Sequence, residues 1–215
     1  GHSDYEEHRY QYATSSHGHD GAMSPAAIVY PQYPNADADV KLAIQWAADR
    51  GVAIAVRTGG HQYCGVSSTG GANIQLDMSR AYTEFEYDAA TGLLRTGISH
   101  KLIDFRAKLA ERGLFVAHGQ CSHVRIGGHA QTGGYGQLSR AFGLFGDHIV
   151  AIRIITADQE VRELTRDSAV AADQELFWAV LGGSPGNFGV LTHVTIRPHH
   201  DEDHPNAHGM KVSRS

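Results

Sequence analysis

The sequence predicts an α+β fold, and three observations carry that prediction. A short apolar run at 26–30, a helix-period pattern at 38–50 and a buried-type strand at 52–57 form a β–α–β opening, which favours an α/β or α+β domain. Several short strand patterns follow this opening, two of them as a hairpin. Three glycine clusters also stand directly beside predicted strands.

The first half of the chain reads as one helix among several strands. Gly51 stands where a left-handed cap would end the helix at 38–50. The apolar positions of this helix fall at i, i+3, i+4 and i+7, namely Val40, Ala43, Ile44 and Ala47. A glycine-rich loop is predicted at 58–71. Further strands are predicted at 73–78, 83–88 and 93–97.

The second half alternates helices with glycine-rich segments. A helix is predicted over 100–112, with Ser99 as its N-cap and Gly113 at its end. Its apolar stripe is Leu102, Phe105 and Leu109. After a glycine-rich stretch at 119–146, the chain predicts a hairpin of 149–156 and 161–164, a helix from Asp173 as cap to Leu181, and a strand at 190–197. From Pro198 onward the sequence is polar and unpatterned.

Composition excludes several classes of protein. The 215 residues suit one large or two small domains, and 41% hydrophobic with 19% charged residues makes disorder throughout a poor expectation. A net charge of −5 disfavours general nucleic-acid binding, and no apolar run is long enough to predict a membrane span. The two cysteines, Cys64 and Cys121, allow one disulfide at most and are too few for a cysteine-rich zinc module.

The first 24 residues carry no periodicity and are interpreted as a polar tail or extended arm. They begin Gly1-His2-Ser3, without an initiator Met, which resembles a tag-removal scar or a processed end. No signal-peptide pattern is visible, so the location of the protein is left open.

The three glycine clusters point to a phosphorylated cofactor, because backbone N–H groups in such loops hold anions. Tight turns without a ligand are the alternative for each cluster. A Walker loop is excluded because no Lys follows the last Gly, and the spacing after Val56 does not fit a Rossmann fingerprint. The sequence therefore predicts another type of phosphate loop, with His61 directly after Gly59 and Gly60.

Four segments taken in order resemble the flavin domain of the berberine-bridge-enzyme-like oxidases, which are FAD enzymes of the vanillyl-alcohol-oxidase type. They are RTGGHQYCG at 57–65, CSHVRIGGH at 121–129, TGGYGQLSR at 132–140, and LFWA at 176–179 with GNFGV at 186–190. The resemblance covers about residues 25–197. It implies a PCMH-type FAD-binding domain made of two α/β subdomains, 25–81 and 82–198, with the flavin between them. Residues 1–24 would be an arm, and 199–215 the start of a linker to a missing substrate domain.

The same resemblance implies a doubly linked FAD, with His61 on the flavin 8α-methyl and Cys121 on the C6 carbon. A neutral imidazole is a good nucleophile near pH 7, and a thiolate is one if positive charge lowers its pKa, which Arg125 and His123 could do. From the residues alone, His61 could be an ordinary turn histidine and Cys121 an inert buried thiol. Val124 matches the position that gates oxygen in this family, although an ordinary core valine is the alternative. Arg125 departs from the family, in which many members have Gly there.

In the predicted binding mode, residues 58–63 would cradle the pyrophosphate, the second cluster would pack beside the isoalloxazine and ribityl chain, and Gly189 and Val190 would lie near the adenosine. His61, Cys121 and Val124 are the predicted catalytic residues. The predicted cofactor-binding residues are Arg57, Thr58, Gly59, Gly60, His61, Gln62, Tyr63, Gly65, Cys121, Val124, Gly127, Gly128, His129, Thr132, Gly133, Gly136, Leu138, Gly186, Asn187, Gly189 and Val190.

The function implied is an oxidase: hydride passes from a CH–OH substrate to flavin N5, and O2 reoxidises the flavin to give H2O2. A carbohydrate or a secondary-metabolite alcohol is the expected substrate, with mono- or oligosaccharides first. The catalytic base is not identified and would come from the missing C-terminal part of the same enzyme, so this segment alone could be inactive. Secretion is an expectation from the resemblance only.

Two alternatives stay open at this stage. One is a flavin-binding module without catalysis. The other is a metal-binding protein, because 15 of 215 residues are His and they cluster at 17–20 and 199–208. Solvated polar tails are the commoner explanation for such clusters, and no metal site is predicted.

Overall fold

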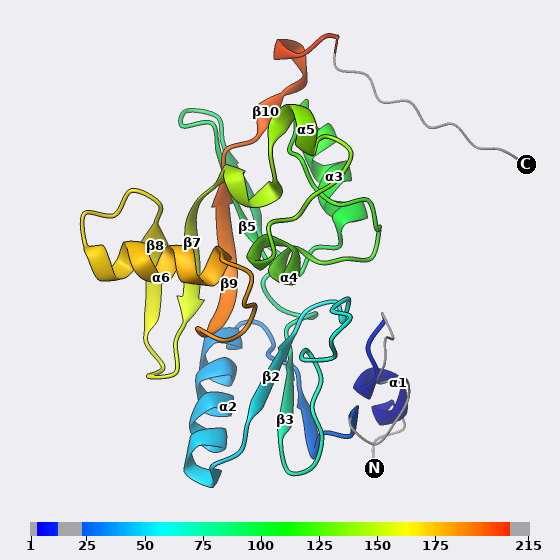
Figure 1. Ribbon diagram of the computed structural model, residues 1–215, viewed down its shortest axis with the longest axis vertical. Helices are drawn as coiled ribbons and strands as arrows, with labels where there is room; N and C mark the ends of the chain where they lie inside the picture. Colours follow the sequence, from blue (N-terminus) through cyan, green and yellow to red (C-terminus); the bar gives the residue numbers. More distant parts are fainter. Residues whose placement is uncertain (1–3, 13–22, 207–215) are drawn as a thin grey trace, which may run out of the picture.

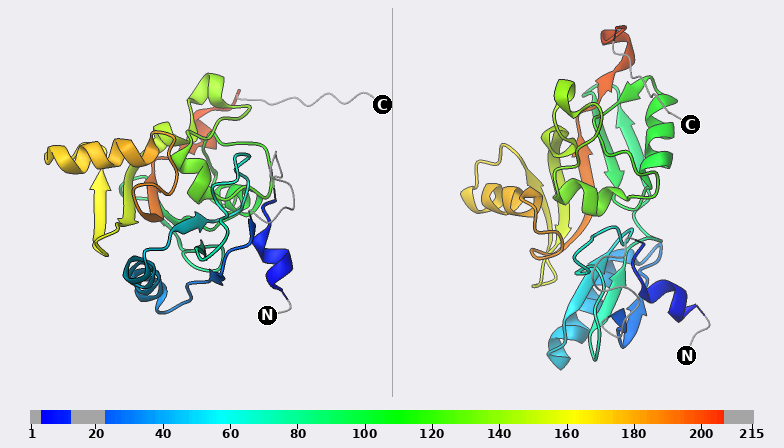
Figure 2. Two further views of the ribbon diagram at one scale, coloured as in Figure 1. Left: turned by 60° about the horizontal axis from the view of Figure 1, so that its bottom comes forward. Right: turned by 45° about the vertical axis from the view of Figure 1, so that its right-hand side comes forward.

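The computed structural model describes residues 4–12 and 23–206 (Figure 1), and these residues form two lobes joined by a narrow waist (Figure 2). Each lobe is built on its own sheet. The first sheet is parallel and the second is antiparallel, so the chain mixes helices and strands in the manner expected of an α+β fold.

The first lobe is a three-stranded parallel sheet with strand order β1-β3-β2. Strands β1 and β2 lie on either side of β3 and run parallel to it, and α2 provides the crossover connection from β1 to β2. A second helix, α1, lies on the side of the sheet opposite to α2 (Figures 1 and 2). The elements of this lobe are α1 (Tyr5–Arg9), β1 (Ala27–Val29), α2 (Ala36–Arg50), β2 (Ile54–Arg57) and β3 (Ile74–Asp77).

The second lobe is a five-stranded antiparallel sheet with strand order β4-β5-β9-β7-β8. Helices α4 and α6 lie against one face of it (Figure 1). The elements are β4 (Phe85–Asp88), β5 (Leu93–Gly97), α3 (Leu102–Ala110), α4 (Ile126–Gln131), α5 (Ser139–Phe142), η2 (Phe145–His148), β7 (Ile149–Ile155), β8 (Val161–Thr165), α6 (Ala171–Leu181) and β9 (Val190–Ile196). A separate small ladder pairs β6 (Leu114–Phe115) with β10 (His199–His200), and η3 (Asp201–Asp203) follows it.

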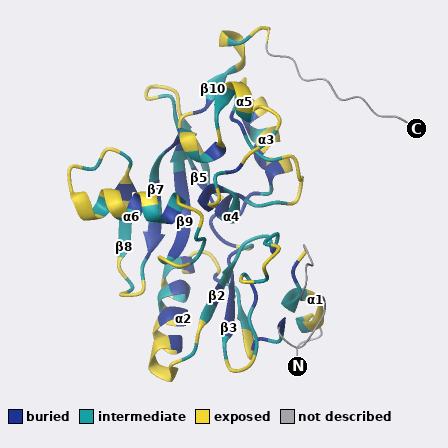
Figure 3. Cartoon of the chain, viewed as in Figure 1, coloured by how far each residue is buried: buried dark blue, intermediate teal, exposed yellow. Residues whose placement is uncertain are grey.

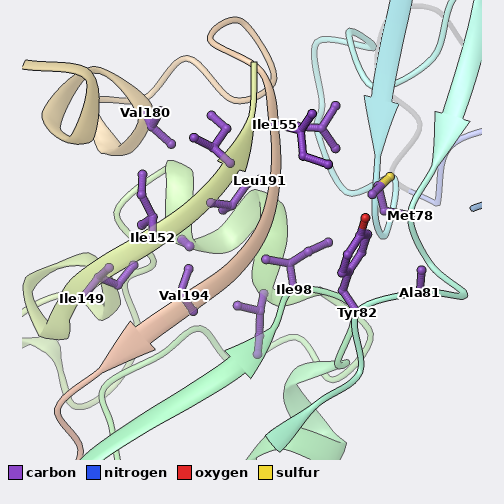
Figure 4. Packing of buried hydrophobic residues seen from close by; sticks show 14 of the residues in the cluster. Met78, Ala81, Tyr82, Ile98, Ile149, Ile152, Ile155, Val180, Leu191 and Val194 are labelled. Carbon is purple, nitrogen blue, oxygen red and sulfur yellow. The ribbon is translucent and has the colours of Figure 1, made fainter. Parts of the chain in front are cut away.

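One continuous buried cluster joins the two lobes. Figure 4 shows Met78, Ala81 and Tyr82, from the connection between the lobes, in the same cluster as Ile98 and Ile155. Figure 3 shows how the buried residues follow the central strands, and β9 is buried along almost its whole length. The lobes are therefore held by shared apolar packing, which fixes the space between them.

The regular elements with a clear period are confirmed. Helix α2 begins two residues earlier than predicted and ends at Gly51, which has φ +60°. Gly113 after α3 also adopts a left-handed conformation, with φ +63°. The predicted hairpin is β7 with β8, paired in antiparallel register.

Both predicted N-caps are wrong. Helix α3 begins at Leu102, and the Ser99 hydroxyl instead donates to the buried Met78 carbonyl. Helix α6 begins at Ala171, so Asp173 lies within its first turn. In both cases a nearby tertiary contact or an earlier helix start removed the need for the predicted side-chain cap.

Several short elements lie where the sequence showed no pattern. Helix α1 falls within the predicted arm, α4, α5 and η2 fall within the glycine-rich stretch at 119–146, and β10 and η3 fall after Pro198. Such elements are too short to show a helical or strand period, and β6 and β10 pair across more than eighty positions. The boundaries proposed for the two subdomains and the linker stay a prediction.

Among the described residues, no helix combines the length and apolar character needed to cross a membrane.

Candidate flavin site between the lobes

A cavity of about 480 Å3 lies where the two lobes meet. Its walls come from the loop after β2, from α4 with its flanks, and from the loop before β9. The lining residues are Val56, Thr58, Gly59, Gly60, His61, Gln62, Tyr63, Ser67, Val124, Arg125, Gly127, Gly128, His129, Gln131, Thr132, Tyr135, Pro185, Gly186 and Leu191.

The first wall is the loop that leaves β2. Gly60 has φ +65°, a conformation that side chains rarely adopt, so glycine is required for this turn. The Arg57 side chain packs beneath Gly60, since a Cβ at Gly60 would lie 3.1 Å from Arg57 Nε. Arg57 Nε also lies 3.5 Å from Asp77 Oδ2 and its Nη1 donates to the His8 carbonyl, so this arginine braces the loop from behind.

The second wall is α4, and glycine lets it approach the first wall closely. A Cβ at Gly127 would lie 2.7 Å from Thr58 Cγ2, whereas a Cβ at Gly128 would have no atom within 4 Å. Arg125, just before this helix, donates hydrogen bonds to the carbonyls of Ser79 and Ser99. Arg125, the residue that departs from the family pattern, thus ties the segment between the lobes to the start of α4.

His61 projects from the first wall with one ring nitrogen unused. Its Nδ1 lies 2.9 Å from the Gly59 carbonyl, which can only accept, so Nδ1 carries the proton. Its Nε2 is buried and has no hydrogen-bond partner among the described residues. Burial lowers the pKa of His61, and the neighbouring charges of His123, Arg57 and Arg125 act in the same direction. The imidazole is therefore neutral at pH 7, with a lone pair on a nitrogen that water does not reach.

Cys121 lies on an exposed turn and is a free thiol, as is Cys64. The turn is anchored to the start of α3, because Leu102 N–H donates to the Val124 carbonyl and Ile103 N–H to the Ser122 carbonyl. Cys121 is therefore exposed, in contrast to the buried thiol considered as an alternative. It is not among the residues that line the cavity.

Val124 is half-buried, lines the cavity and also packs against the apolar core. Both interpretations of this residue are thus compatible with its position. It stands three residues after Cys121, at the C-terminal end of the same turn.

His129 has a structural hydrogen bond at the cavity edge. Its Nε2 accepts from Gly119 N–H at 3.0 Å, and burial lowers the pKa of His129 to about 4. A Cβ at Gly119 or Gly134 would lie 2.8 or 2.7 Å from this imidazole. The neutral ring of His129 therefore links α4 to the chain that leads into Cys121.

Gln131 is a cavity residue that the sequence did not indicate. Its Oε1 accepts from Gly186 N–H at 3.1 Å, and its Nε2 donates to the Gly127 carbonyl at 2.9 Å. It joins the third glycine cluster to α4. No pattern marked it, because a single glutamine inside a glycine-rich stretch carries no periodic signal.

The structure brings together twelve of the predicted site residues as cavity lining: Thr58, Gly59, Gly60, His61, Gln62, Tyr63, Val124, Gly127, Gly128, His129, Thr132 and Gly186. The other predicted residues do not line it: Arg57, Gly65, Cys121, Gly133, Gly136, Leu138, Asn187, Gly189 and Val190. Two glycines of this second group are packed closely against backbone. A Cβ at Gly136 would lie 1.9 Å from the His118 carbonyl oxygen, and one at Gly189 would lie 2.5 Å from the Ile155 carbonyl oxygen.

A second hollow of about 500 Å3 runs along β1 and α2, and none of the predicted site residues line it.

Across the described ranges, no group of three or more His, Cys, Asp or Glu residues is arranged to hold a metal ion. Of the histidine clusters noted in the sequence, 17–20 and His208 lie outside the described residues. His199 packs between the rings of Phe115 and Phe142.

Comparison with protein families matches residues 25–165 to the family described as FAD binding domain. The chain belongs to this FAD-binding family. It is 35% identical over 159 residues to aclacinomycin-N/aclacinomycin-A oxidase of Streptomyces galilaeus, covering 72% of this chain and 29% of that protein. It is 30% identical over 177 residues to chitooligosaccharide oxidase of Gibberella zeae, covering 81% and 34%.

The fold is likewise shared with solved structures of this family. A berberine-bridge-enzyme-like protein of Physcomitrella patens superposes with a TM-score of 0.79 and 29% identity, covering 93% of this chain and 41% of that one. The PCMH-type α+β fold and the resemblance to berberine-bridge-enzyme-like FAD-linked oxidoreductases are therefore confirmed. The chain spans about a third of the length of the curated relatives it matches.

The cavity fits an FAD on its own features. Glycines allow the backbone of both walls to come close to a ligand, and the apolar side chains of Val56, Val124 and Leu191 suit a flat aromatic ring. His61 adds a buried ring nitrogen without a partner. Such a nitrogen is costly to bury unless a ligand engages it.

Proposed function

We propose that this chain is the flavin-binding part of an FAD-dependent oxidase whose flavin is bonded to both His61 and Cys121. The observation that carries the proposal is the buried, unpartnered Nε2 of His61 on a glycine-lined cavity between the lobes. Membership of a family of FAD-linked oxidoreductases supports the cofactor class.

The cofactor held in this cavity would supply hydride acceptance from a CH–OH carbon of the substrate and reoxidation by O2 to H2O2, with a base to take the hydroxyl proton. The residues described here bind and orient that ring. Thr58 to Tyr63 offer backbone N–H groups on one wall, and α4 closes the other wall. Val124 would make an apolar contact with the ring at the start of the α4 wall.

The proposed bonds require nucleophiles in the right protonation state. The lowered pKa of His61 keeps its imidazole neutral at pH 7. In the net reaction, a methyl C–H bond of the flavin and the Nδ1–H bond of the imidazole are broken, a C–N bond to Nε2 is formed, and the two protons and two electrons released pass to O2 as H2O2. The Cys121 bond follows the same balance, with the ring C6–H and the thiol S–H bonds replaced by a C–S bond.

We propose a carbohydrate or a secondary-metabolite alcohol as the substrate class. Support comes from the names of relatives, which include a chitooligosaccharide oxidase and an aclacinomycin oxidase. Both are oxidases by name, and this chain spans only 34% and 29% of their lengths. We propose that the substrate pocket lies in the remaining part of such an enzyme.

Intact mass and absorption after denaturation test the covalent flavin. The protein reconstituted with FAD in aerobic buffer should keep a yellow chromophore and a mass increment of one FAD in acid. His61→Ala and Cys121→Ala should each retain one bond, and the double variant should release all flavin. A wild-type protein that releases all its flavin on denaturation would overturn the covalent proposal.

The oxidase step is tested separately, in the full enzyme that contains this chain. Addition of an oligosaccharide should bleach the flavin band under anaerobic conditions, and air should restore it with formation of H2O2. A flavin that is covalently held and never bleached by any substrate of these classes would favour a flavin-binding module without catalysis.

A further inference from the structure

The N-terminal segment 4–12 is bound to the first wall of the flavin cavity by specific hydrogen bonds. The His8 carbonyl accepts from Arg57 Nη1 at 2.9 Å and from Gln75 Nε2 at 3.2 Å. The Arg9 carbonyl accepts from Ser68 Oγ at 3.0 Å. These donors belong to the end of β2, to β3 and to the glycine-rich loop, so the segment is held by the same elements that build the wall.

Two further contacts fix the end of this segment. Gln11 is only 4% exposed, and its Oε1 accepts from the Ser67 hydroxyl. On its other side, the Arg9 guanidinium donates to the Met23 carbonyl and to Ser24 Oγ. The chain therefore reaches residue 12 in a defined position next to a cavity-lining serine.

Tyr12 contacts His61, the histidine on which the proposed function depends. Its ring stacks on His61 with a centroid distance of 4.3 Å and an interplanar angle of 28°. The same ring lies 6.0 Å from His123, which is two residues after Cys121. One residue of the N-terminal segment thus contacts both the His61 loop and the Cys121 turn.

We infer that Tyr12 is a positioning residue for covalent flavin attachment: its stacked ring fixes the plane of the His61 imidazole and screens that ring from water. Between them, the Gly59 carbonyl and the Tyr12 face determine which nitrogen carries the proton and how the ring is turned. The ring contact is the part that matters, so the Tyr12 hydroxyl is dispensable. This inference rests on the proposed function.

The step that Tyr12 assists is the His61 bond alone. A flavin methyl C–H and the imidazole N–H are replaced by a C–N bond, with O2 as the oxidant reduced to H2O2. Tyr12 contributes no atom or electron to this balance. It raises the fraction of time that the imidazole presents its lone pair in the correct direction.

The experiment compares Tyr12→Ala, Tyr12→Phe and wild type for the rate of covalent attachment after mixing apoprotein with FAD in air. Mass increments in acid-quenched samples report the bond directly. Tyr12→Ala should slow attachment about 2- to 10-fold, the range expected for the loss of one aromatic stack, and Tyr12→Phe should restore the wild-type rate. Tyr12 is 67% exposed, so the alanine variant removes little buried area and should fold.

A control and a second readout separate positioning from general destabilisation. Trp178→Ala removes an exposed aromatic residue on α6 and should leave the attachment rate unchanged. In apoprotein, NMR titration of the His61 ring should give a higher pKa in Tyr12→Ala than in wild type, because water then reaches the imidazole.

The outcomes are distinguishable from those of the proposed function. If wild type forms the bond and Tyr12→Ala forms it equally fast, the inference is overturned and the proposed function stands. If Tyr12→Phe is as slow as Tyr12→Ala, the hydroxyl matters and the stacking argument is wrong. If wild type forms no bond, the proposed function fails, and an unchanged His61 pKa in Tyr12→Ala would overturn the role of Tyr12 as well.

Discussion

The two walls of the flavin cavity are built in different ways. The wall after β2 is an irregular loop braced by side chains, with Arg57 beneath Gly60 and the N-terminal segment bound across it. The wall at α4 is a short helix in which Gly127 packs against the Thr58 side chain, and the chain that follows this helix packs backbone against backbone at Gly136 (Figure 1). Side-chain bracing can adjust when one atom moves, whereas backbone packing cannot. We therefore expect a substitution at Gly136, in the chain that follows the helix wall, to cost more stability than one at the loop wall.

The largest effect is expected at Gly136. A Cβ there would lie 1.9 Å from the His118 carbonyl oxygen, so Gly136→Ala must displace backbone and should destabilise the protein by about 3 kcal/mol or more. Gly128→Ala is the matched control, since its Cβ meets nothing within 4 Å and it lies within helix α4. The control should be as stable as wild type or up to about 1 kcal/mol more stable. Urea denaturation followed by circular dichroism measures both, and equal midpoints for Gly136→Ala and wild type would contradict the packing argument.

The second effect is a pH dependence at His129. Its pKa of about 4 in the folded protein lies below the usual 6.5, so the unfolded chain takes up this proton first as pH falls. Stability is therefore complete above pH 6.5 and is lost between pH 6.5 and 4, by about 3 kcal/mol from this residue. His129→Gln can still accept the Gly119 N–H bond and cannot titrate, so its free energy of unfolding should fall less steeply over this range. Identical slopes for the two proteins would show that His129 is not buried as a neutral ring.

A third prediction concerns the clamp before α4. Arg125→Met keeps the length of the side chain and removes the donors to the Ser79 and Ser99 carbonyls. Ser99 is a buried residue. The unpaired carbonyls should cost about 1–3 kcal/mol in a urea titration. Arg140→Met, at an exposed site, should change stability by less than about 0.5 kcal/mol. The clamp would be discounted if both variants unfolded at the same urea concentration.

The smallest effect is expected at the loop wall. Gly60→Ala places a side chain at φ +65° and 3.1 Å from Arg57 Nε, and the flexible arginine can move away. We expect a loss of about 1 kcal/mol, mostly from the backbone conformation. Gly71→Ala has nearly the same φ, +66°, with no atom within 4 Å, so the difference between the two variants measures the contact with Arg57. A loss at Gly60 as large as that at Gly136 would remove the distinction between side-chain bracing and backbone packing.

Much of the architecture could be predicted where the chain carries a period. Helix α2 shows apolar residues every three or four positions, and the β7–β8 hairpin shows two strand patterns around a polar turn. Helix α4 shows neither, because Gly127 and Gly128 have poor helix propensity, and Gly127 is needed for close packing against Thr58. Ser99 was predicted to be a helix cap because its residue type favours that role. Its hydroxyl instead donates to the buried Met78 carbonyl on another segment.

The site was predicted unevenly for the same reason. The glycine clusters and His61 carry motifs, and each of the three clusters contributes at least one residue to the cavity lining, as does His61 itself. Gln131 and Tyr12 carry no motif, since each acts through a partner far along the chain.

The amino-acid sequence by itself determined the order of the regular elements and the presence of a histidine beside paired glycines. Local spacing is enough for these, because they depend on neighbours within a few positions. Only the tertiary structure decided that the His61 loop, helix α4 and Tyr12 meet at one cavity. Their contacts join residues dozens of positions apart, as Arg57 and His8 do across 49, and no local period encodes such a meeting.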